Sequence, residues 1–252
     1  MTSTETIIPY SFSVIMPAYN SELTIKDSIE SVLNQTYDNF KLYIINDCSN
    51  DNTESIIQSF NDPRIIYIKN VINKGVSDSR NIGINLSTSE YISFLDSDDT
   101  WIHNKLELQL NEFKKGYDIV CSNYLTFHSS SSEDTKCRIS PELITHSMML
   151  KSNLIGNLTG AYNCLSLGKV YQKKIGHEDY VMWLELIKKT KYAYCIQKPL
   201  AKYRLQNSSL SGNKYKAIRW QWKIYRNELS LSLPKTVYYF SHYIFNALKK
   251  RR

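Results

Sequence analysis

The chain has 252 residues, enough for one substantial hydrophobic core in a single domain or in a domain with an extension. Apolar residues make up 42% and charged residues 22%, which excludes a chain that is disordered throughout. The five cysteines are widely spaced, odd in number and without a C-x-x-C pair, so we expect a reducing compartment and neither a disulfide framework nor structural zinc. No signal-peptide pattern and no run of about 18 apolar residues is visible, so the sequence predicts no leader and no membrane-spanning helix.

The net charge of +7 is unevenly distributed along the chain. Residues 213–252 hold ten Lys and Arg against one acidic residue, a net charge of +9, whereas the 21 basic and 23 acidic residues of 1–212 give −2. We therefore expect an electrostatic partner to be attracted by the C-terminal segment. The same division predicts a globular domain over 1–212 and a basic helical extension over 213–252.

Strands and helices are predicted to alternate in the first part of the chain. Apolar runs bounded by turn residues predict strands at 12–16, 42–45, 65–68 and 91–95. Helical periodicity predicts a helix capped by Ser21, followed by helices at 53–60 and 77–86. This alternation is typical of a mostly parallel α/β sheet with right-handed crossovers.

The pattern changes in the second half. It predicts a strand at 118–126, a mobile loop at 128–140, a binding loop at 153–168, a helix at 178–189, a strand at 192–196, and two helices from Tyr215 onward that separate near Pro234.

Three short segments follow predicted strands, at the carboxyl ends where parallel sheets bind ligands. They are 17–20, Asp47 and 96–99. The carboxylates of Asp96, Asp98 and Asp99 are crowded at one strand end, so they need a counter-charge, and their oxygens suit Mg²⁺ or Mn²⁺. The alternative is a polar turn in which Asp98 or Asp99 caps a helix that begins near Trp101.

Five segments together resemble the inverting glycosyltransferases of family 2, which have the GT-A fold. They are Val14–Glu22 (VIMPAYNSE), Ile45–Asp51 (INDCSND), Asn73–Asn81 (NKGVSDSRN, which matches N-x-G-x-x-x-A-R-N except for Ser79), the D-x-D motif Asp96–Asp98, and the pair Glu178–Asp179. The resemblance covers residues 12–211. It implies a Rossmann-like, mostly parallel sheet flanked by helices, with a nucleotide-binding half over about 12–100 and an acceptor-binding half over about 101–212.

The resemblance also implies roles for individual residues. The nucleotide-sugar would contact Pro17, Ala18, Tyr19, Glu22, Asp47, Asn73, Gly75, Arg80, Asp96 and Ser97. Asp98, assisted by Asp96, would ligate Mn²⁺ or Mg²⁺, and Asp179 would be the general base of a single inverting displacement. On the acceptor side or its loops we expect His177, Glu178, Trp183, Arg204 and Ser209.

Plainer interpretations stay open for several of these residues. Asp47 could form an ordinary Asx-turn, and Arg80 could be a surface arginine on a helix. Glu178 and Asp179 could have no catalytic role and simply stabilise the positive N-terminal end of a helix. One residue departs from the family pattern Y-R-x-H-x-x-S-x-S: Gln206 stands at the histidine, which puts an imidazole ligand to the metal in doubt.

A narrower likeness, carried by 177–184, is to bacterial enzymes of lipopolysaccharide, capsule and O-antigen synthesis. It implies a UDP-hexose donor, with galactose or glucose expected, and a glycolipid or oligosaccharide acceptor. The alternatives are a nucleotidyltransferase, which usually opens with a Gly-rich loop, and an inactive sugar-nucleotide-binding module. A dinucleotide oxidoreductase is disfavoured because G-x-G-x-x-G is absent after the first strand.

The basic C-terminal segment has three interpretations. Aromatic and apolar residues at 237–240 followed by a basic cluster at 249–252 favour an anionic membrane surface, and we expect a cytoplasmic protein held peripherally at the membrane. Trp220, Trp222 and Tyr225 between Lys and Arg could instead stack on nucleic acid, which we do not expect to be a partner. The segment could also be a solvated helix pair that packs on the body.

Overall fold

The computed structural model describes residues 8–128, 134–205 and 214–249. In these ranges the strands form one mixed sheet in the order β3-β2-β1-β4-β9-β6-β10-β5, with β7 on β6 and β8 on β10. The strands are β1 (Ile8–Ala18), β2 (Phe40–Asn46), β3 (Ile65–Lys69), β4 (Ser89–Phe94), β5 (Thr100–Trp101), β6 (Ile119–His128), β7 (Asp134–Arg138), β8 (Leu143–Ile144), β9 (Ala161–Asn163) and β10 (Ala193–Leu205).

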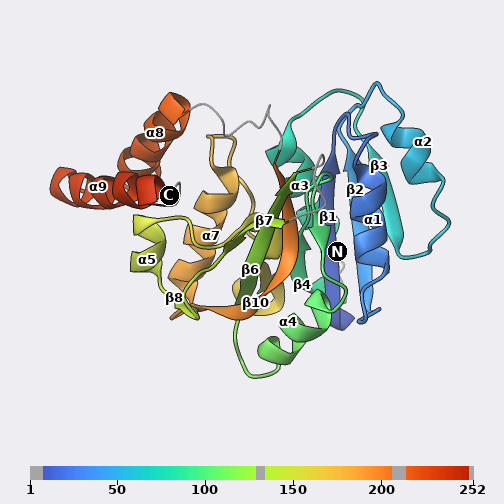
Figure 1. Ribbon diagram of the computed structural model, residues 1–252, viewed down its shortest axis with the longest axis horizontal. Helices are drawn as coiled ribbons and strands as arrows, with labels where there is room; N and C mark the ends of the chain where they lie inside the picture. Colours follow the sequence, from blue (N-terminus) through green and yellow to red (C-terminus); the bar gives the residue numbers. More distant parts are fainter. Residues whose placement is uncertain (1–7, 129–133, 206–213, 250–252) are drawn as a thin grey trace, which may run out of the picture.

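Helices cover the faces of this sheet (Figure 1). They are α1 (Ile25–Leu33), α2 (Thr53–Gln58), α3 (Val76–Leu86), α4 (Lys105–Phe113), α5 (His146–Lys151), the 3-10 turn η1 (Asn157–Thr159), α6 (Cys164–Leu167), α7 (Glu178–Lys189), α8 (Lys214–Lys223), the π-helical turn η3 (Ile224–Glu228) and α9 (Leu233–Lys249). None of these described helices is long and apolar enough to cross a membrane.

The first part of the chain, up to about residue 100, has the predicted alternation of parallel strands and helices. β1 pairs in parallel with β2 and β4, and β2 pairs in parallel with β3. Val14, Ile15 and Met16 of β1 are fully buried, because this strand lies between two others and under helices on both faces. The carboxyl ends of β1, β2 and β4 therefore meet at one edge of the sheet, with 17–20, Asp47 and 96–99 beside one another.

The second half departs from the predictions in three places. The predicted loop at 153–168 contains η1, α6 and the short strand β9, which pairs antiparallel with both β4 and β6. The described part of the predicted loop at 128–140 includes β7, which pairs antiparallel with β6. Trp101 begins no helix: it pairs with Ala201 of β10 and donates its indole N–H to the Leu158 carbonyl at 2.7 Å, and α4 starts four residues later.

The first helix also begins later than predicted. Its N-cap residue is Thr24, and the carbonyl of Ser21 accepts the N–H groups of Thr24 and Ile25 in the preceding turn. The Ser21 hydroxyl instead lies 2.7 Å from that of Ser97, which joins the turn after β1 to the D-x-D segment.

The C-terminal extension packs on α5 and α7 through one side only. Tyr225 of η3 is fully buried and donates its hydroxyl to the Leu150 carbonyl at 2.5 Å, and Asn246 of α9 donates to the Lys151 carbonyl. Figure 1 places α8 and α9 beyond α7, at the end of the molecule opposite to α2 and β3. The C-terminal helices separate near Pro234 as predicted: η3 ends at Glu228 and α9 begins at Leu233, so Pro234 lies in the first turn of α9, where its missing N–H costs no hydrogen bond.

Candidate active site

A cavity of about 780 Å³ opens where the carboxyl ends of β1, β2 and β4 face the start of α7. Of the residues singled out in the sequence, it is lined by Pro17, Ala18, Tyr19, Asp47, Asn73, Gly75, Arg80, Asp96, Ser97, Asp98, Asp179 and Arg204. Glu22, His177, Glu178 and Trp183 do not line it, and Ser209 and Gln206 lie outside the described residues. The cavity therefore brings the D-x-D carboxylates and the candidate base to one space.

Asp47 organises the loop that follows β3. The side chain is buried, and its two oxygens accept the side-chain amide of Asn70 at 2.7 Å and the backbone N–H groups of Lys74 at 2.9 Å and Gly75 at 2.7 Å. Gly75 has a φ of 91°, a conformation that other residues rarely adopt, and it starts α3. Because a carboxylate can accept about four hydrogen bonds, Asp47 keeps capacity for one ligand N–H.

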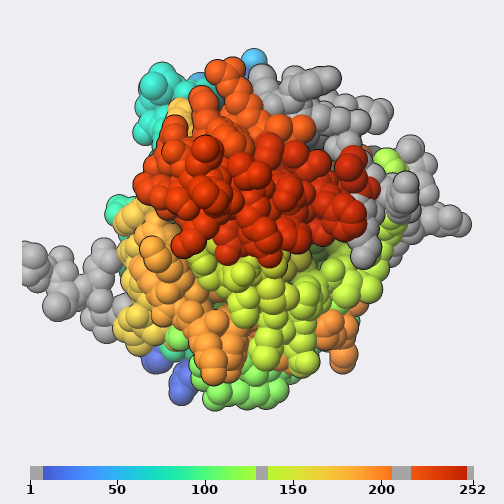
Figure 2. All heavy atoms as spheres, turned by 90° about the vertical axis from the view of Figure 1, so that its left-hand side faces the viewer, coloured from blue at the N-terminus to red at the C-terminus, as the bar shows by residue number. Residues whose placement is uncertain are grey.

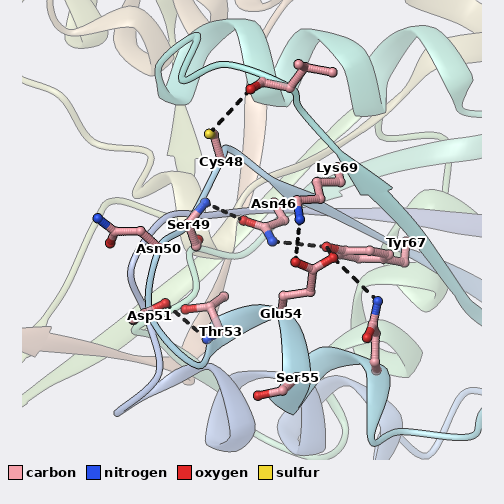
Figure 3. Close-up of polar contacts among 12 residues, drawn as sticks. Asn46, Cys48, Ser49, Asn50, Asp51, Thr53, Glu54, Ser55, Tyr67 and Lys69 are labelled. Carbon is pink, nitrogen blue, oxygen red and sulfur yellow. Dashed lines mark hydrogen bonds and ion pairs between the residues drawn. The ribbon is translucent and has the colours of Figure 1, made fainter.

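The turn after β2 is held by its own polar contacts (Figure 3). Asn46 accepts the Ser49 N–H and donates to the Tyr67 hydroxyl, each at 3.0 Å. Asp51 accepts the N–H of Thr53 at 3.0 Å, which forms an Asx-type turn before α2, and it also accepts the N–H of Glu22. The Glu22 carboxylate in turn accepts two N–H groups of Asn52, so it joins two loops beside the cavity.

Arg80 on α3 faces the D-x-D segment. Its guanidinium is buried and donates to Asp96 at 2.5 Å and to the Gln172 side chain at 3.2 Å. Its Nε is also buried and finds no partner among the described residues. The buried cation compensates part of the negative charge at this strand end, which an ordinary surface arginine does not do.

Arg204 on β10 fixes the same segment from the other side. Its backbone N–H donates to the Asp99 carboxylate at 2.8 Å, and its Nε donates to the Asp98 carbonyl at 2.8 Å. Burial and the nearby charge of Asp96 raise the pKa of Asp98 to about 6, and burial with the charges of Asp98 and Asp96 raises the pKa of Asp99 well above its ordinary value. Both carboxyls therefore bind a proton more readily than an exposed aspartate, and an added cation beside them would favour their ionised form.

The donor set fits a hard divalent cation that is shared with a ligand. Within 8–128, 134–205 and 214–249, no group of three or more His, Cys, Asp or Glu side chains could enclose a metal ion. Asp96 and Asp98 offer one or two carboxylates, which is the usual protein contribution when substrate phosphates complete the coordination of Mg²⁺ or Mn²⁺.

Asp179 lies in the first turn of α7 and lines the same cavity, close enough to Arg80 and Asp96 to interact with their charges. Burial raises the pKa of its carboxyl, and the positive charge of Arg80 and the influence of His177 offset only part of this shift. Glu178 accepts the Gly176 N–H at 3.3 Å, so its carboxylate closes the turn before the helix. The carboxyl of Asp179 is therefore more basic than that of an exposed aspartate.

The turn that places Asp179 is held by α8. Gly176 and His177 both have left-handed backbone conformations, with φ of 81° and 52°. A Cβ on Gly176 would lie 2.4 Å from the ring of Trp220, and the His177 ring meets the same ring edge-on at 5.5 Å. From the sequence, Trp220 is placed only in the basic extension, so its contact with this turn is not predicted. The Gly-His pair before Glu178 is the local signal that the turn needs support.

The wall between the D-x-D turn and Asp179 includes residues that the sequence did not single out. They are Tyr124, Asn153, Gly156, Asn157, Leu158 and Tyr203. The indole N–H of Trp183 donates to the Asn157 side-chain oxygen at 3.3 Å, and the Trp183 ring fills the space beside Gly160. Trp183 is fully buried and so supports this wall from behind.

The sequence profile of the family described as Glycosyl transferase family 2 matches residues 13–171. The chain belongs to glycosyl transferase family 2. This family 2 chain is 36% identical over 243 residues to the UDP-Glc:alpha-D-GlcNAc-diphosphoundecaprenol beta-1,3-glucosyltransferase WfgD of Escherichia coli, covering 96% of this chain and 95% of the relative. It is 37% identical over 246 residues to the putative teichuronic acid biosynthesis glycosyltransferase TuaG of Bacillus subtilis, covering 95% and 96%.

Solved structures share the fold of this family 2 enzyme. TarS 1–349 of S. aureus in complex with UDP superposes with a TM-score of 0.70 at 18% identity, covering 93% of this chain and 70% of TarS. The mannosyltransferase PcManGT of Pyrobaculum calidifontis, in complex with GDP-Man and Mn²⁺, gives a TM-score of 0.65 at 12% identity, covering 88% and 64%. The predicted family and the predicted GT-A fold are confirmed.

Proposed function

We propose that this glycosyltransferase moves a hexose from a UDP-sugar to a hydroxyl of a lipid-linked or oligosaccharide acceptor, with inversion at the anomeric carbon, in bacterial surface-polysaccharide synthesis. The observation that carries the proposal is one cavity lined by both the D-x-D carboxylates and Asp179. The similarity to WfgD, a UDP-Glc:alpha-D-GlcNAc-diphosphoundecaprenol beta-1,3-glucosyltransferase, favours glucose over galactose and a saccharide diphosphate lipid as acceptor.

The nucleotide occupies the side of the cavity formed by the carboxyl ends of β1 and β2. Asp47 accepts the imide N–H of uracil with its remaining lone pair, while Asn70, Lys74 and Gly75 hold the carboxylate in place. Tyr19 and Pro17 line the same part of the cavity, and Tyr19 is half exposed, so its ring is available to cover a base.

Asp98 and Asp96 would hold Mn²⁺ or Mg²⁺ beside the donor diphosphate, and a bound cation would supply positive charge against the negative charge of the leaving group. Arg80 keeps Asp96 in position through its 2.5 Å hydrogen bond and carries a second positive charge into the site. Arg204 keeps the turn from Asp98 to Asp99 in one conformation.

Asp179 takes the proton of the acceptor hydroxyl as that oxygen attacks the anomeric carbon. The new carbon–oxygen bond forms while the bond to the diphosphate oxygen breaks, and UDP leaves with the electron pair. Attack from the wall opposite the nucleotide inverts the anomeric centre. The raised pKa of the buried carboxyl suits a base that must bind a proton in the transition state.

A donor screen tests this function. UDP release is measured with UDP-glucose, UDP-galactose and UDP-N-acetylglucosamine, with a GlcNAc-diphospholipid as acceptor, and with Mn²⁺ or EDTA. We expect acceptor-dependent release from one UDP-hexose that EDTA abolishes and Mn²⁺ restores. Release of diphosphate instead of UDP would indicate a nucleotidyltransferase, and UDP binding without turnover for any donor would indicate an inactive binding module.

A further inference from the structure

Helix α9 presents two different faces. Thr236 is fully buried, and Tyr239 and Phe240 pack on the main hydrophobic core. The opposite face is exposed along the whole helix, and its members recur at helical intervals of three or four residues: Pro234, Val237, Tyr238, Ser241, Phe245 and Leu248. In Figure 2 this helix, in red, crosses the middle of one face of the molecule.

We call these six residues the α9 stripe. The side chains of Phe245, Leu248 and Val237 are 65%, 60% and 52% exposed. Exposed apolar side chains that lie together on one face indicate an interaction surface. Lys235, His242 and Lys249 recur every seven residues, so they follow one edge of the stripe.

We propose that the α9 stripe docks on an anionic lipid surface, with its apolar side chains in the interface and the positive charge of the C-terminal segment attracted by the lipid head groups. The net charge of +9 in this segment, against −2 in the rest of the chain, complements such a surface and orients the extension toward it. The inference rests on the proposed function in one respect, since a lipid-linked acceptor lies at that surface. An interfacial helix of this kind combines an apolar face with flanking cations.

Nucleic acid fits the same segment less well. The aromatic residues that alternate with Lys and Arg are engaged within the protein: Trp220 packs on Gly176, Trp222 meets Phe240 edge-on at 5.1 Å, and Tyr225 is fully buried. Bases would therefore find no free aromatic ring among these three residues. A second copy of the chain on the α9 stripe would bring two segments of charge +9 together, which disfavours self-association.

Vesicle binding by two matched double variants tests the proposal. Val237→Asp with Phe245→Asp places two charges in the α9 stripe, and Ile139→Asp with Leu165→Asp makes the same change at exposed apolar residues elsewhere. Co-sedimentation uses phosphatidylglycerol–phosphatidylethanolamine vesicles and phosphatidylcholine vesicles, without nucleotide or acceptor. We expect the stripe variant to bind the anionic vesicles at least about tenfold more weakly, and the control variant to bind within about threefold of wild type.

Two further measurements distinguish lipid docking from self-association and from a loss of activity. UDP release with a soluble acceptor analogue should be equal in both variants and wild type, so a failure of the docking proposal is distinct from a failure of the proposed activity. Equal vesicle binding by the two variants, or wild-type binding that is the same for phosphatidylcholine and unaffected by salt, overturns the proposal. A wild-type dimer that the stripe variant converts to a monomer, with vesicle binding unchanged, also overturns it, because the stripe is then an interface between copies.

Discussion

Replacement of Asp179 by asparagine separates proton transfer from packing at the candidate base. Asparagine keeps the size of the side chain and one acceptor oxygen, but it takes up no proton at neutral pH. Burial raises the pKa of Asp179, against the opposing effects of Arg80 and His177, so the wild-type carboxyl binds a proton more readily than an exposed one. General-base catalysis contributes about 10²–10⁴-fold, and we expect kcat to fall by such a factor while UDP affinity changes less than about twofold.

The assay is UDP release at saturating donor and acceptor over a pH series, with calorimetry for UDP binding. In the wild type the base must be ionised, so kcat should fall as the pH is lowered through a value above the ordinary aspartate pKa of about 3.9, and Asp179→Asn should lack this dependence. Glu178→Gln is the matched control, because Glu178 does not line the cavity and its carboxylate accepts the Gly176 N–H, and it should cost less than about tenfold.

The same substitution has a predicted effect on stability. A carboxyl whose pKa is higher in the folded than in the unfolded protein favours the fold when it is protonated, and this advantage is lost as the pH rises through the unfolded and then the folded value. Asp179→Asn should therefore raise the Tm at neutral pH while it lowers kcat. A variant that retains wild-type turnover refutes the assignment of the base, and a variant with both low turnover and a low Tm refutes the electrostatic reasoning.

Substitutions at three other positions test the rest of the site. Asp98→Asn should remove the stimulation of transfer by Mn²⁺ without lowering the Tm, because burial and the charge of Asp96 already oppose ionisation of this side chain; undiminished stimulation would exclude it from the metal site. Asp47→Ala should weaken UDP binding in calorimetry by about 1–3 kcal/mol and lower the Tm, because the uracil imide and three protein N–H groups lose their acceptor; unchanged affinity would contradict its role. Trp220→Ala should lower kcat with little change in UDP affinity, and Trp220→Phe should restore much of the activity, whereas equal loss of both quantities would indicate general misfolding.

The first part of the chain, up to about residue 100, could be predicted from the sequence because local signals and the fold agree there. Buried strands read as apolar runs, and each is followed by a polar turn, so Asp47 and the D-x-D segment could be placed at one edge of the sheet. Helix α7 has the bounds predicted from its apolar periodicity and acidic first turn, Glu178–Lys189.

The second half could not be predicted in the same way, because tertiary contacts decide its elements. β9 has only three residues, and it is a strand because β4 and β6 offer backbone partners on both sides. In the first part of the chain, Glu22 belongs to a segment that matches the family, yet its carboxylate accepts hydrogen bonds from Asn52 at the turn before α2 and does not line the cavity. Trp220 supports the turn before Asp179 from more than forty residues away, a relation that no local pattern contains.

The anomeric configuration of the product tests the central claim most directly. The geometry of one base facing the D-x-D wall predicts a single displacement, so transfer from an α-linked UDP-hexose should give a β-linked product. Proton NMR of the purified product reads this configuration from the anomeric coupling constant. A β-linked product that forms with the wild type and is lost with Asp179→Asn supports the account, and an α-linked product contradicts it.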